Sequence, residues 1–123
     1  MVESRALIVD DEDDMRLLVR STIEAANKGL SVAGEAANGH EALAAWREHH
    51  PDVIVLDHRM ADLTGIEVAD RIRAEQPDQQ IILFSAFLTD DLVHQAEAMG
   101  LHCLAKDRMR EIPEMMWRLA AGS

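Results

Sequence analysis

The hydrophobic residues of this chain fall into short runs that recur along its length. Three of these runs, in residues 6–9, 52–57 and 80–85, are rich in Val, Ile and Leu. A continuous apolar run of this length is typical of a strand buried on both faces, as in a parallel sheet. Two further runs lie in residues 30–36 and 101–105. The pattern therefore predicts five strands.

Between these runs, apolar residues recur at three- and four-residue spacing, which is the period of an amphipathic helix. The predicted helices span residues 12–27, 39–50, 64–76, 89–100 and 112–121. Local signals support their ends. Asn38 and Glu41 have the spacing of a capping box, Gly100 suits the end of a helix, and Pro113 suits a helix start.

The predicted strands and helices alternate through the whole chain. Such alternation predicts a parallel sheet with helices on both faces. Five strands and five helices in 123 residues fit a flavodoxin-like, doubly wound α/β fold with the strand order 2-1-3-4-5. We expect one domain over residues 1–123. Sheets of this kind bind ligands at the carboxyl ends of their strands, near the point where the strand order reverses.

Composition and charge narrow the functional classes. The chain is 48% hydrophobic and 28% charged, with a net charge of -11. This acidity argues against direct binding of nucleic acid and suits a cation or a basic protein partner. No apolar run approaches the ~20 residues of a membrane helix, so we expect no membrane association. The single cysteine, Cys103, excludes a disulfide within the chain and fits a reducing, cytoplasmic location.

Reactive side chains follow four of the five predicted strands. Asp10 and Asp11 end the first strand, Asp57 the third, Ser85 the fourth and Lys106 the fifth. The predicted topology gathers all of them on one rim of the sheet. Two carboxylates ~4 Å apart repel by about 4 kcal/mol at an effective dielectric constant of about 20. A divalent cation relieves this repulsion, and oxygen ligands with open positions suit Mg²⁺.

The acidic run continues after the first strand with Glu12, Asp13 and Asp14. Acids in this position often open a helix, because the N-terminal end of a helix carries partial positive charge. We therefore expect these three residues to begin the first helix and to lie outside the metal site.

Four segments of the chain resemble the receiver domain of bacterial two-component response regulators. They are "LIVDDEDDMR", "VIVLDHRMADLTGIEV", "IILFSA" and "CLAK", in this order. The resemblance covers essentially the whole chain. It implies that Asp57 accepts a phosphoryl group from a sensor histidine kinase or a phosphotransfer protein. It also implies that Asp11, Asp57 and the backbone carbonyl of Arg59 hold Mg²⁺, with Asp10 acting mainly through a metal-bound water.

The resemblance implies two further roles and a contact surface. Lys106 would pair with one phosphoryl oxygen, and Ser85 would hydrogen-bond another when phosphate arrives. The implied protein is a phosphoacceptor regulator and not an enzyme, although it would assist its own phosphorylation and dephosphorylation. A homodimer contact or an output partner is expected at the face formed by residues 89–100, 101–105 and 112–121.

Some positions depart from the family pattern. Cys103 stands where an aromatic residue usually moves with the switch, and Asp107 replaces the usual Pro after the lysine. These departures leave open an alternative, a receiver-like interaction module that works without phosphorylation. The family's dephosphorylation rate depends on the positions of Arg59 and Phe87, whose bulk predicts a long-lived phosphoryl state. The sequence leaves both a single-domain regulator and the receiver part of a longer regulator open.

Overall fold

Strands and helices alternate along the chain in the computed structural model, which describes residues 3–122. The strands are β1 (Ser4–Val9), β2 (Leu30–Ala36), β3 (Val53–Leu56), β4 (Gln80–Ser85) and β5 (His102–Ala105). The helices are α1 (Asp13–Ala26), α2 (Gly39–His49), α3 (Gly65–Glu75), α4 (Asp90–Ala98) and α5 (Ile112–Gly122). All of these elements were predicted. A short 3₁₀ helix, η1 (Lys106–Glu111), was not predicted.

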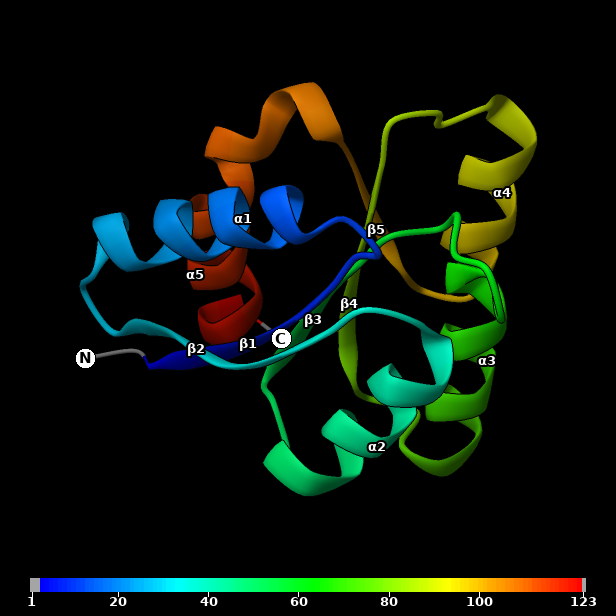
Figure 1. Cartoon of the computed structure of the whole chain (residues 1–123), viewed down its shortest axis with the longest axis horizontal. Coiled ribbons are helices and arrows are strands. Elements are labelled where there is room, and N and C mark those ends of the chain that lie inside the picture. The colour runs from blue at the N-terminus through cyan, green and yellow to red at the C-terminus, as the bar shows by residue number, and fades with distance from the viewer. Residues whose placement is uncertain (1–2, 123) are drawn as a thin grey trace.

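The five strands form one parallel sheet in the order β2-β1-β3-β4-β5, which confirms the doubly wound topology. Helices α1 and α5 cover one face, and α2, α3 and α4 cover the other (Figure 1). Within residues 3–122, no helix is both long and apolar enough to cross a membrane.

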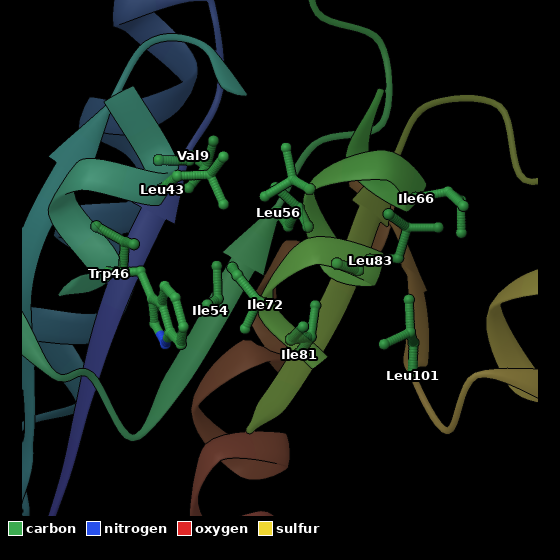
Figure 2. Packing of buried hydrophobic residues seen from close by; sticks show 14 of the residues in the cluster. Val9, Leu43, Trp46, Ile54, Leu56, Ile66, Ile72, Ile81, Leu83 and Leu101 are labelled. Carbon is green, nitrogen blue, oxygen red and sulfur yellow. The ribbon is translucent and has the colours of Figure 1, made fainter. Parts of the chain in front are cut away.

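Each face of the sheet carries its own hydrophobic core, because successive strand residues point to opposite sides. In β3, Val53 and Val55 pack towards α1 and α5, whereas Ile54 and Leu56 pack towards α2 and α3. Figure 2 shows the second of these cores, where Ile54 lies close to the ring of Trp46. Burying an aliphatic side chain of this size stabilises the fold by about 1.5–3 kcal/mol. Both faces of β3 are therefore anchored, which holds its carboxyl end in place.

The strand register places two acids side by side. Val9 of β1 is level with Leu56 of β3, so the residues that follow, Asp10 and Asp57, leave the sheet together. The backbone continues this pairing, since the Asp57 N–H donates to the Val9 carbonyl at 2.9 Å. The rigid centre of the sheet thus fixes the backbone of both acids.

The loop after β3 turns tightly into α3. Thr64 and Glu67 form a complete capping box at the start of this helix. A Cβ atom on Gly65 would lie only 2.6 Å from the carbonyl oxygen of Asp57. Glycine is required here because the backbone of α3 approaches the end of β3 too closely for any side chain.

Candidate functional site

The structure brings the predicted rim residues together at the carboxyl edge of the sheet. Asp10 and Asp57 are buried beside each other, at 2% and 5% exposed. A cavity of about 250 Å³ lies beside Asp57 at this edge. It is lined by Asp11, Glu12, Asp57, Arg59, Ser85, Ala86, Phe87 and Lys106. Acids from two strands, a hydroxyl from a third and an amine from a fourth therefore share one pocket.

Lys106 reaches across the edge of the sheet to both buried acids. Its Nζ lies 2.8 Å from Asp10 Oδ2 and 3.5 Å from Asp57 Oδ1. Burial alone would lower the pKa of Lys106, but the hydrogen bond to Asp10 and the charge of Asp57 outweigh burial and raise it. The side chain is therefore a fixed ammonium that can donate to an incoming anion.

The carboxylate of Asp57 is held from one side. Its Oδ1 accepts a hydrogen bond from the backbone N–H of His58 at 2.9 Å and faces Lys106. Burial, and then the charge of Asp10, raise the pKa of Asp57 to about 6, against the opposing charge of Lys106. A cation in the pocket would favour the charged form of this carboxyl.

Three acids gather at the β1 side of the cavity. Carboxylate oxygens of Asp10, Asp11 and Glu12 all lie within 4.8 Å of one another. Glu12 stands at the N-cap of α1, but its side chain makes no capping hydrogen bond. Sequence reasoning assigned Glu12 to the helix start because acids usually serve there, and only the turn after β1 shows it beside the other two. Asp13 differs, because it pairs with Arg16 on the helix surface.

The residues present fit a hard divalent cation. Carboxylate oxygens are the ligands that Mg²⁺ prefers, and the cavity beside them leaves room for water or phosphate. Of the predicted ligands, Asp10 and Asp11 belong to the acid cluster, whereas Asp57 and Arg59 line the same cavity without belonging to it. Asp10 also accepts from Lys106, so this acid links the cluster to the ammonium.

The mouth of the cavity is formed by the loop after β4. Ser85 is buried, and its Oγ accepts a hydrogen bond from the Phe87 N–H at 3.3 Å. Phe87 is 62% exposed, and the guanidinium of Arg59 stacks over its ring at 5.0 Å. This cation–π contact joins the loops after β3 and β4 across the cavity. The hydroxyl of Ser85 is thus coupled to the backbone of the loop after β4.

Comparison with known proteins identifies the family. The sequence profile described as the response regulator receiver domain matches residues 6–116. The chain belongs to the response regulator receiver family. It is 38% identical over 96 residues to the chemotaxis protein CheY of Thermotoga maritima, covering 78% of each chain. Its fold also matches the crystal structure of a two-component response regulator of the LuxR family from Aurantimonas sp., with a TM-score of 0.90 and 28% identity, over 98% of this chain and 86% of that one.

Receiver domains also occur within longer proteins. The chain is 40% identical over 96 residues to the protein-glutamate methylesterase/protein-glutamine glutaminase of Halobacterium salinarum. The matched region covers 78% of this chain but only 27% of that protein. The activity in that name belongs to the longer protein, whereas the shared part is the receiver domain. Receiver domains act in two-component signalling as phosphoacceptors that contact kinases, phosphotransfer proteins and output partners.

Proposed function

We propose that this chain is a phosphorylation-dependent switch whose phosphoacceptor is Asp57. The observation that carries the proposal is the buried Asp57 carboxylate, held 3.5 Å from the Lys106 ammonium beside a cluster of three acids. Phosphoryl transfer needs positioning and neutralisation of charge more than covalent assistance. This pocket offers a carboxylate nucleophile, a fixed positive charge and a place for a cation.

The transfer step is a displacement at phosphorus. An oxygen of Asp57 attacks the phosphoryl group of a phosphohistidine on a kinase or phosphotransfer protein. The new O–P bond forms an acyl phosphate, and the P–N bond breaks with its electron pair returning to the imidazole. Lys106 donates hydrogen bonds to the phosphoryl oxygens. In this scheme the domain is a reactant in the transfer and not an enzyme acting on a separate substrate.

A bound Mg²⁺ would neutralise charge on the phosphoryl oxygens. Asp10 and Asp11 would hold it together with Asp57 and the backbone carbonyl of Arg59, and Asp10 would act mainly through water. The clustered oxygens of Asp10, Asp11 and Glu12 support this assignment. A cation at this point would also offset the desolvation penalty of the buried acids and their mutual repulsion.

The conformational response would begin at Ser85. Its hydroxyl now accepts from Phe87, and it would turn to an oxygen of the new phosphoryl group. This exchange would pull the loop after β4 and change the α4–β5–α5 face, where we place a homodimer contact or an output partner. Cys103, in β5, cannot supply the usual aromatic movement. The single domain over residues 1–123 and the cytoplasmic location stay predictions.

Incubation with Mg²⁺ and acetyl phosphate tests the phosphoacceptor directly. We expect intact mass to increase by one phosphoryl group, because acetyl phosphate supplies an activated phosphoryl group without a kinase. The gain should vanish in Asp57→Asn and persist in Asp78→Asn, which removes an exposed acid before β4. No gain with any donor would favour the alternative, an interaction module that works without phosphorylation.

The Arg59–Phe87 contact predicts a long-lived phosphoryl group. Both side chains line the cavity and stack on each other, so they would hinder a water molecule that approaches the phosphorus. We expect a half-life of many minutes, and a rate of loss about tenfold faster in the Arg59→Ala, Phe87→Ala double variant, which corresponds to ~1.4 kcal/mol. Mass spectrometry after removal of the donor measures the decay.

A second cation–π pair offers a matched control for this prediction. Arg47 stacks over Trp46 at 5.8 Å on the surface of α2, away from the cavity. Arg47→Ala should leave the decay rate unchanged. A wild-type half-life of seconds would contradict the predicted shielding.

A further inference from the structure

Asp62, in the loop between β3 and α3, holds the start of a different helix. Its Oδ1 accepts a hydrogen bond from the Gly39 N–H at 2.9 Å, and its Oδ2 accepts from the His40 N–H at 2.9 Å. His40 Nδ1 lies 2.6 Å from the same Oδ2. Both amides belong to the first turn of α2. The bonds from Gly39 and His40 hold the pKa of Asp62 well below its ordinary value, so the group is a carboxylate at neutral pH.

The same loop is fixed at its base. The Gly65 N–H donates to the carbonyl of His58 at 2.9 Å, which closes residues 58–65 into a compact loop. The Leu63 N–H donates to Asp62 Oδ1 at 2.8 Å, which orients the carboxylate from within the loop. Asp62 therefore anchors the middle of this loop to α2. Arg59 lies in the same part of the loop, three residues before Asp62.

We propose that Asp62 is a positioning residue, which anchors the loop carrying Arg59 to α2 and so keeps the Arg59 carbonyl in place for the cation. The inference rests on the proposed function, because it concerns the same metal site. Asp62 is not among the residues that line the cavity, so its effect on the cation would be indirect. A loop that is already ordered loses little conformational entropy when its backbone binds a ligand.

A purely local role is the alternative explanation. An acid that accepts from the first amides of a helix also stabilises that helix as a cap. The chain offers a way to separate the two roles, because α2 has a second cap of its own. The side chain of Asn38 accepts from the Glu41 N–H at 2.9 Å, and its hydrogen bonds within residues 3–122 go to Glu41 and not to the loop after β3. Asn38→Ala and Asp62→Ala therefore each remove one cap from α2, but only Asp62→Ala releases the loop.

Hydrogen exchange of the metal-free protein, followed by mass spectrometry of peptides covering residues 57–65, reads out the anchor without any ligand. We expect Asp62→Ala to speed exchange in this segment about tenfold. Asn38→Ala should leave it unchanged, although both variants should loosen the start of α2. Asp62→Asn keeps one acceptor oxygen and should give an intermediate result. Equal loop exchange in Asp62→Ala and Asn38→Ala would overturn the anchoring role.

Calorimetric titration with Mg²⁺ alone then measures the consequence for the site. We expect the affinity to fall about three- to tenfold in Asp62→Ala, the scale of ordering one or two additional groups on binding. It should stay at the wild-type value in Asn38→Ala. Wild-type binding with no loss in Asp62→Ala would overturn the positioning role. Failure of the wild-type protein to bind Mg²⁺ would instead overturn the proposed function, and the role of Asp62 in the metal site with it.

Discussion

Asp57→Asn should make the metal-free protein more stable at neutral pH, even though it removes the proposed phosphoacceptor. The fold raises the pKa of Asp57 from 3.8 to about 6, mainly through burial and the charge of Asp10. Between about pH 4 and pH 6, the folded state therefore retains a proton on Asp57 that the unfolded state has already released. Stability falls as the pH rises through this window and stays lower above it. At neutral pH the buried charge of Asp57 therefore lowers the free energy of unfolding by about 3 kcal/mol.

Urea unfolding in the presence of a chelator, at about pH 4.5 and about pH 7.5, measures this cost, because the first value lies near the lower end of the window and the second lies above it. The wild-type free energy of unfolding should drop relative to Asp57→Asn by on the order of 2–3 kcal/mol between them. Asn keeps an oxygen that can accept from Lys106, so the variant preserves the local packing. Asp14→Asn is the matched control, because it removes an exposed charge from α1 and leaves the buried acids intact. A variant no more stable than wild type at pH 7.5 would contradict the prediction.

The topology and the approximate site could be predicted because they depend on patterns that local sequence carries directly. The apolar runs around Val9, Leu56 and Leu83 are continuous because both faces of these strands are covered. Once the strands are placed in a parallel sheet, their carboxyl ends meet, and Asp10 and Asp57 follow from the register. No side-chain geometry is needed for this step. The strand order and the gathering of the rim residues were therefore accessible in advance.

The contacts of individual side chains could not be predicted, because they depend on how loops close. Glu12 has the position of a helix-opening acid, and only the turn after β1 brings its carboxylate to Asp10 and Asp11. Asp62 lies 23 residues after Gly39, and no periodic pattern marks their contact. The 3₁₀ helix η1, which begins at Lys106, has no apolar repeat that could have predicted it. These contacts determine how the site is held and tuned.

Asp11→Ala should weaken Mg²⁺ binding about tenfold or more, and Asp14→Ala should change it less than about twofold. Loss of a partner that is hydrogen-bonded directly to a metal ligand already costs about 10- to 100-fold, so loss of a ligand itself costs at least as much. Asp11 contributes an oxygen to the acid cluster, whereas Asp14 lies in the first turn of α1 and is exposed. Each variant removes one negative charge, so the pair separates direct ligation from the general acidity of the surface, which salt screens over about 10 Å at 0.1 M.

Calorimetric titration with Mg²⁺ at about 0.1 M salt, paired with the initial rate of phosphorylation by acetyl phosphate, makes the comparison. Both quantities should fall together in Asp11→Ala, because in the proposed function the cation and the phosphoryl group would share one cavity. Glu12→Gln should weaken Mg²⁺ binding by a smaller factor, about threefold, as expected for a clustered acid that water separates from the ion. Equal affinities in Asp11→Ala and Asp14→Ala would show that the cation does not bind at this cluster. An unchanged affinity in Glu12→Gln would return Glu12 to the role that its sequence position predicts, the opening of α1.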